Sequence, residues 1–165
     1  MKVNAMKQKG AQAVEFALVL PFFILILFLV LDFGMLVYNK AIITNASREG
    51  ARSGVLFTPP PWSNAAAIDA ACNYARSALI GVNRGTTSTK CTSKENPTVT
   101  VFVGGTAPCP SPSSSGSKPP EFGDLIAVTI KYSFSGFLLG SGWFGTGTSA
   151  SRPFELTACT QMRHE

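Results

Sequence analysis

Four cysteines are the residues of this sequence whose chemistry is easiest to name: Cys72, Cys91, Cys109 and Cys159. None stands in a Cys-x-x-Cys pair. Zinc sites usually present closely spaced ligand pairs, so the spacing favours two disulfides over a metal centre, and no cofactor is expected. Three connectivities are open. We favour Cys72–Cys91 with Cys109–Cys159, because the first pair closes a short local loop.

Catalysis and nucleic-acid binding find little support in the remaining residues. His164, the single histidine, has no evident nucleophile–base partner, and no glycine-rich phosphate loop or paired-carboxylate motif is present. The net charge is +5, but Lys2, Lys7 and Lys9 supply three of these charges, which leaves +2 for the rest of the chain. No basic stripe with interleaved aromatic residues remains. We therefore expect neither an enzyme nor a nucleic-acid-binding protein.

A long apolar segment near the N-terminus determines where the rest of the chain lies. Residues 16–31 carry no charge, Asp32 interrupts the run, and apolar character resumes to Tyr38. A helix over residues 16–38 would be about 35 Å long, enough to cross a hydrocarbon core of about 30 Å. The three early lysines place the N-terminus in the cytoplasm, so the cysteines lie outside, where disulfides persist. A cleavable secretory signal is the alternative, but no good small-x-small cleavage site follows the apolar run.

Two residues of this segment are unusual for a simple anchor. Glu15 abuts the apolar run, where a carboxylate has a desolvation cost unless it finds a partner; an interfacial position near the helix N-terminus is the simpler explanation. Pro21 removes a backbone donor inside the expected helix and favours a kink, although membrane helices tolerate proline more often than soluble helices do.

The order of residues around Gly10 resembles the type IV prepilin junction. A short basic leader ends in Gly10, and Glu15 stands five residues later at the start of a hydrophobic helix. In that family a prepilin peptidase cuts after the glycine. The resemblance implies a cut between Gly10 and Ala11, with Glu15 fifth and Phe16 sixth in the mature chain. The new amine at Ala11 could then pair with Glu15 of a neighbouring subunit, which would select the correct register in a helix bundle.

Further segments narrow the resemblance to the TadE-like family, the pseudopilins and assembly proteins of tight-adherence (Tad/Flp) pili. They are residues 13–21 (AVEFALVLP), residues 45–52 (NASREGAR) and residues 159–165 (CTQMRHE). Phe16 departs from the pattern, because major pilins of these systems usually carry tyrosine there.

The resemblance implies a minor pilin or pseudopilin that takes part in assembly of a Tad pilus, a type IVb-like adhesion fibre. Its expected partners are prepilin peptidase, other pilins or pseudopilins, and Tad assembly-platform proteins. Its expected location is the bacterial inner membrane, crossed once, with the C-terminal domain periplasmic or extracellular and open to incorporation in the pilus. The alternative is an uncleaved membrane-anchored module that binds other pilus or secretion components.

The anchor helix is expected to continue to about Val55. Ile42, Ala46, Gly50 and Gly54 recur at four-residue spacing and form a narrow stripe, which either packs within the same subunit or admits a neighbouring helix. Three prolines then stop the helix. A second helix starts at a cap on Ser63 or Asn64 and ends near Gly81 or within residues 83–85. Its apolar face consists of Ile68, Ala71, Cys72, Ala75 and Leu79.

Period-two alternation after the second helix predicts three strands. They cover residues 98–103, residues 126–134 and residues 154–162. The expected fold is α+β and pilin-like: a long transmembrane helix that continues into a small extracytoplasmic domain with a second helix and a three-stranded antiparallel sheet. The domain boundaries are a cytoplasmic leader (1–10), a transmembrane and assembly helix (11–38) and the extracytoplasmic domain (39–165).

An apolar, glycine-rich loop at residues 136–145 has two possible roles. It either folds back over the core or forms an exposed contact patch for another pilus component or the membrane surface. The residues of this patch are Phe137, Leu138, Leu139, Trp143 and Phe144.

Overall fold

A computed structural model describes residues 4–56, 63–80, 91, 96–104, 109, 121–134, 136 and 154–164, with side chains described from residue 12 onward. Its elements, in chain order, are α1 (Asn4–Val55), α2 (Ala65–Ala78), β1 (Thr98–Gly104), β2 (Leu125–Phe134) and β3 (Phe154–Arg163). A long helix, a second helix and three antiparallel strands confirm the predicted α+β class and the order of its parts.

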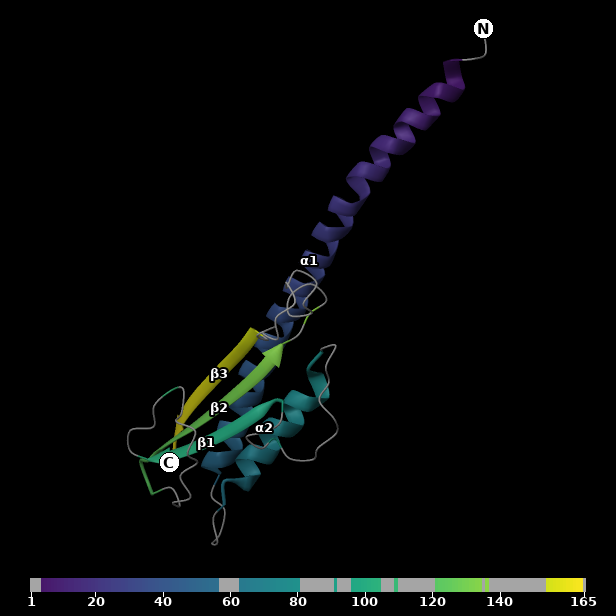
Figure 1. Ribbon diagram of the computed structural model, residues 1–165. Helices are drawn as coiled ribbons and strands as arrows, with labels where there is room; N and C mark the ends of the chain where they lie inside the picture. Colours follow the sequence, from purple (N-terminus) through teal and green to yellow (C-terminus); the bar gives the residue numbers. More distant parts are fainter. Residues whose placement is uncertain are drawn as a thin grey trace, which may run out of the picture.

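The domain has two layers, and α1 extends far beyond both of them (Figure 1). The C-terminal part of α1 lies side by side with α2, and together they cover one face of the sheet. α1 packs on β2 and β3, whereas α2 packs on β1. The N-terminal part of α1 projects away from the domain (Figure 1).

The sheet has the order β1-β2-β3, and alternate residues of its strands face the helices. Val101 pairs with Val128, which pairs with Thr160 on β3. The buried residues on the helix-facing side are Val99, Val101, Val103, Ile126, Val128, Ile130, Tyr132, Phe134 and Ala158. Burial raises the pKa of the Tyr132 phenol above its ordinary value of 10.0. The predicted alternation is therefore confirmed for this face.

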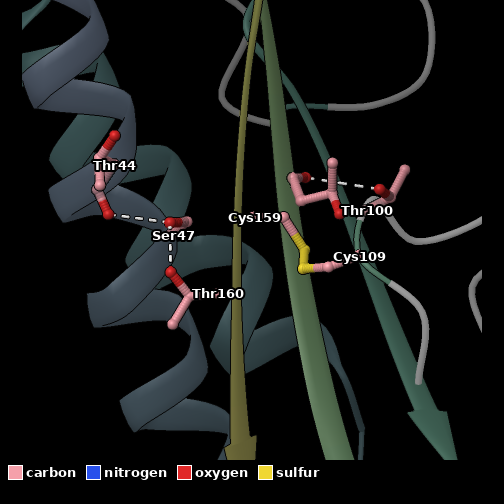
Figure 2. Close-up of a disulfide and its surroundings, with 7 residues drawn as sticks. Thr44, Ser47, Thr100, Cys109, Cys159 and Thr160 are labelled. Carbon is pink, nitrogen blue, oxygen red and sulfur yellow. Dashed lines mark hydrogen bonds between the residues drawn. A yellow bond between two sulfur atoms is a disulfide. The ribbon is translucent and has the colours of Figure 1, made fainter. Parts of the chain in front are cut away.

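The opposite face of the sheet is less open than its sequence suggested. Ala127 and Thr129 on β2 belong to the polar-facing set of the alternation, yet neither has any exposed surface. Cys159 pairs with Thr129 in the sheet register, and the Cys109–Cys159 disulfide lies on this face, away from α1 (Figure 2). The disulfide holds Cys109 at the outer side of the sheet.

The small-residue stripe of α1 packs within the chain. A Cβ atom added at Gly50 would lie 2.7 Å from the Cβ of Ala71 and 3.0 Å from the carbonyl oxygen of Ala67, both on α2. At Gly54 the added atom would lie 3.2 Å from the Cβ of Ala67. The glycines therefore let α2 approach α1 more closely than a residue with a side chain would allow. This close packing compensates for the poor helix propensity of glycine.

The second helix ends earlier than predicted. It stops at Ala78, because Leu79 is extended (φ −65°, ψ 134°), rather than near Gly81. The buried side chain of Asn39 on α1 binds both backbone groups of Ile80: its Nδ2 donates to the carbonyl oxygen at 2.6 Å, and its Oδ1 accepts from the amide at 3.0 Å. Asn64 precedes the helix as predicted but makes no side-chain capping hydrogen bond.

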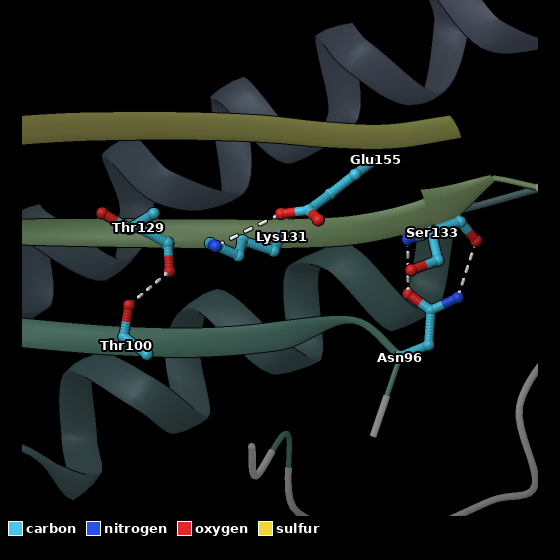
Figure 3. A network of polar contacts seen from close by, with 6 residues as sticks. All are labelled: Asn96, Thr100, Thr129, Lys131, Ser133 and Glu155. Atoms are coloured by element: carbon cyan, nitrogen blue, oxygen red, sulfur yellow. Dashed lines mark hydrogen bonds and ion pairs between the residues drawn. The ribbon is translucent and has the colours of Figure 1, made fainter. Parts of the chain in front are cut away.

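A second asparagine holds the start of β1 to the end of β2 (Figure 3). Asn96 Nδ2 donates to the carbonyl oxygen of Ser133 at 2.8 Å, and its Oδ1 accepts from the Ser133 amide at 2.9 Å. An exposed ion pair of 3.2 Å joins Lys131 to Glu155 across β2 and β3. Because both partners are about half exposed, this ion pair adds little to stability.

Two disulfides link distant parts of the domain. Cys72 on α2 is bonded to Cys91, and Cys109 is bonded to Cys159 on β3. This is the pairing that the short loop between the first two cysteines favoured. The first disulfide is buried beside α2, and the second lies on the outer face of the sheet. Together they attach Cys91 and Cys109, which lie outside the described helices and strands, to the domain.

Candidate functional site: the N-terminal part of α1

The bare segment of α1, residues 12–31, makes the most unusual surface of the molecule. Every side chain in it is exposed, although nearly all are large and apolar. Phe16 is 68% exposed and Val30 is 62% exposed. Soluble monomers rarely expose apolar area on this scale. The segment therefore needs lipid or another protein around it.

Length and composition make lipid the natural surrounding. α1 from Gln12 onward is long and apolar enough to cross a membrane, and it is the only such helix in the described part of the chain. A helix satisfies all its interior backbone hydrogen bonds within itself, as the hydrocarbon core requires. The helix indicates single-pass membrane anchoring.

Glu15 is the only charged residue of the bare segment. Its side chain is exposed on α1, as are those of Phe16 and Pro21. Pro21 lies inside the helix without ending it. The structure thus places all three predicted assembly residues on the surface that the domain leaves uncovered. Glu15 belongs to the N-terminal part of α1, and this part projects away from the domain (Figure 1).

Gly10 and Ala11, the predicted processing site, lie within the first turns of α1. The backbone there is helical rather than extended. A peptidase that binds its substrate in an extended form would have to unwind these turns. Gly10 makes this easier, because glycine destabilises a helix by about 1 kcal/mol relative to alanine.

Asp32 is a notable residue whose burial the sequence did not reveal. It follows the bare segment directly, and its side chain has no exposed surface. A Cβ atom added at Gly136, two residues beyond β2, would lie 2.7 Å from the Asp32 Cγ and Oδ2 atoms. The carboxylate therefore rests against the Gly136 backbone. The sequence signal was a single acid within an apolar run, which often marks a functional position in a membrane helix.

The other predicted sites divide into two groups. The four cysteines are paired, as described above. The five residues of the predicted contact patch lie outside the described residues: Phe137, Leu138, Leu139, Trp143 and Phe144. Among the side chains that the structure describes, no group of three or more His, Cys, Asp or Glu residues could hold a metal ion.

Comparison with known proteins gives a family match that lies within α1. Curated proteins and solved structures gave no match. Residues 10–52 match the model of the family described as TadE-like protein. The match covers the bare segment and most of the packed part of α1, and it ends before α2 and the sheet. Over residues 10–52 the chain is similar to TadE-like proteins, and this similarity suggests a part in the assembly of a Tad pilus.

Proposed function

We propose that the chain is a minor pilin or pseudopilin of a Tad pilus, cut after Gly10 by prepilin peptidase. The observation that carries this proposal is the carboxylate of Glu15, the one charged group on an exposed and mainly apolar helix surface. Such a surface suits both a membrane and a bundle of like helices. The TadE-like match covers the same residues.

The proposed chemistry is charge pairing between subunits. Cleavage between Gly10 and Ala11 creates a positive amine four residues before Glu15. In a bundle of parallel helices, the amine of one subunit neutralises the Glu15 carboxylate of the next only in the correct stagger. An unpaired charge inside such a bundle costs several kcal/mol, so wrong registers are disfavoured. Phe16 and Pro21 shape the helix surface next to this pair.

The proposed orientation places the N-terminus in the cytoplasm and the disulfide-bonded domain outside the inner membrane. Three lysines before the apolar segment favour this orientation. Disulfides persist outside the cytoplasm, which agrees with it. The proposed partners are prepilin peptidase, other pilins or pseudopilins, and proteins of the Tad assembly platform.

Replacement of Glu15 tests the proposal. Glu15→Gln keeps the side-chain size and removes the charge, so the neighbouring amine would lose its partner. We expect the free energy of the contact between subunits to weaken by roughly 3–5 kcal/mol. Pilus assembly and co-purification with other pilins should fall accordingly. The unfolding of the domain should not change. Glu49→Gln is the matched control, because Glu49 is an exposed glutamate on the packed part of the same helix.

Two outcomes would contradict the proposal. Normal assembly in Glu15→Gln would show that the charge has no role between subunits. Equal loss in the Glu15 and Glu49 variants would show a general effect of acidic charge on α1. The alternative function, an uncleaved anchored module for other envelope components, predicts that substitutions at Gly10 leave the mass of the mature chain unchanged.

A further inference from the structure

From the placement of Asp32 and Gly136, we infer that the domain is seated in the outer headgroup layer of the membrane. In this arrangement the hydrocarbon core ends at Leu31, and Phe154, exposed at the end of the sheet, contacts lipid headgroups. The sequence alone had extended the membrane segment to Tyr38. The inference concerns the anchored chain and depends on neither cleavage nor pilus assembly.

Helix length sets the first part of this arrangement. Every side chain of the bare segment, residues 12–31, is exposed, and the next residue, Asp32, is fully buried by the domain. The uncharged residues 16–31 span about 24 Å, and the four residues before them bring the bare segment to about 30 Å, the thickness of a hydrocarbon core. Glu15 then lies within about 5 Å of the N-terminal edge of the core, where its carboxylate can reach the headgroups. The domain therefore begins where the core ends, and no length of bare helix remains to hold the domain away from the membrane.

The burial of Asp32 fixes the level of the sheet end relative to the membrane. A carboxylate at the edge of the hydrocarbon is costly when it faces lipid. Asp32 avoids this because it is fully buried, with Gly136 against its carboxylate. Gly136 lies two residues beyond the end of β2, and Phe134 pairs there with Phe154 at the start of β3. This end of the sheet therefore lies level with Asp32.

The exposed residues at this level suit a headgroup layer. Phe33, Val37 and Tyr38 on α1 are 61%, 50% and 43% exposed, and Phe154 at the sheet end is 48% exposed. Phe33 to Tyr38 covers about 8 Å of helix axis, close to the thickness of one headgroup layer, about 5–8 Å. The aromatic rings, Tyr38 above all, suit this zone, and Lys40 supplies the first cation beyond it.

Probe depth in a bilayer tests the seating. Because every described cysteine is in a disulfide, a single added cysteine provides the labelling site. The full chain would be labelled with a fluorophore at Val30→Cys, Val37→Cys, Phe154→Cys or Leu56→Cys, in vesicles of phosphatidylethanolamine and phosphatidylglycerol at low protein density. Lipids quenched near the acyl-chain end, lipids quenched at the headgroup, and aqueous iodide then report the depth of each probe.

We expect the Val30 probe to be quenched mainly by the deep lipid, and the Val37 and Phe154 probes mainly by the headgroup lipid. Leu56, exposed at the far end of α1, should respond to iodide alone. Deep quenching at Val37 would overturn the inference, because the hydrocarbon core would then reach Tyr38. A response to iodide alone at Val37 and Phe154 would also overturn it, because the domain would then stand clear of the membrane.

A glycine substitution tests whether the Asp32 contact holds the sheet end in place. Gly136→Ala puts a methyl group 2.7 Å from the Asp32 carboxylate, whereas Gly34→Ala on the same helix meets nothing within 4 Å. In Gly136→Ala we expect the Phe154 probe to lose its headgroup quenching and gain iodide quenching, while Gly34→Ala leaves it unchanged. An unchanged Phe154 depth in Gly136→Ala would show that this contact does not seat the domain.

Discussion

α1 is one continuous helix whose two segments differ in residue size, polarity and burial. The bare segment, residues 12–31, exposes every side chain and consists mainly of large apolar residues, with Glu15 as its one charged residue. The packed segment, residues 32–55, buries one face that is rich in small and polar residues: Asp32, Asn39, Ile43, Ala46, Ser47, Gly50, Ala51 and Gly54. Large apolar side chains thus cover the part of α1 that faces lipid or other subunits. Small side chains line the part that α2 and the sheet approach closely.

The difference shows that the helix has two separate sources of stability. Backbone contacts at Gly50 and hydrogen bonds from Asn39 and Ser47 tie the packed segment to α2 and the sheet. Ser47 reaches the Thr160 hydroxyl on β3 at 2.7 Å (Figure 2). The side chains of the bare segment are exposed, so lipid or other subunits rather than the domain surround them. Changes in the domain should therefore leave the bare segment helical in lipid, and changes in the bare segment should leave the domain folded.

The largest expected effect comes from the buried disulfide. Replacing both Cys72 and Cys91 with alanine opens a link between residues 19 apart in sequence, which should lower the free energy of unfolding of the domain by about 3 kcal/mol. Amide hydrogen exchange in lipid vesicles would follow both segments of α1. We expect faster exchange in the packed segment and unchanged protection in residues 12–31. Loss of protection in both would show that the two segments form one cooperative unit.

A smaller effect is expected from two glycines on the same helix. Gly50→Ala forces a methyl group against Ala71 and should destabilise the domain by about 1–3 kcal/mol. Gly34→Ala meets nothing within 4 Å and should be neutral or stabilising by up to about 1 kcal/mol. Chemical unfolding in detergent, followed by circular dichroism, would compare them. Equal effects would mean that close approach of α2 does not explain Gly50.

Asn39 offers a comparison within the packed segment itself. Asn39→Ala leaves the amide and carbonyl of Ile80 without their side-chain partner and should cost about 1–2 kcal/mol. Asn45→Ala on the exposed side of α1 should change stability by less than about 0.5 kcal/mol. The same unfolding experiment measures both variants. A neutral Asn39→Ala variant would show that water replaces the amide without loss.

Local patterns in the sequence predicted most of the fold. Alternation in residues 126–134 gave the central strand, and the four-residue spacing of Ala46, Gly50 and Gly54 marked the face of α1 that α2 approaches. These signals depend on neighbours along the chain, so they survive without knowledge of the tertiary structure. The TadE-like segments at residues 13–21 and 45–52 were recognisable for the same reason, because both lie in one helix.

Features that depend on distant partners were not predictable. The early end of α2 involves Asn39, 41 residues before Ile80. The burial of Thr129 on the outer face coincides with a disulfide whose cysteines are 50 residues apart. Asp32 read only as a break in an apolar run, because its contact with Gly136 joins residues more than a hundred positions apart. No local period reports such contacts.

Intact mass with N-terminal peptide mapping, on protein from the native host, tests the proposed function most directly. The account predicts a mature chain that begins at Ala11, and a Gly10→Val variant that keeps its leader and its full mass. A chain that begins near Met1 in both proteins would contradict prepilin processing. The bare segment would then be a permanent anchor, and Glu15 would have no new amine to pair with.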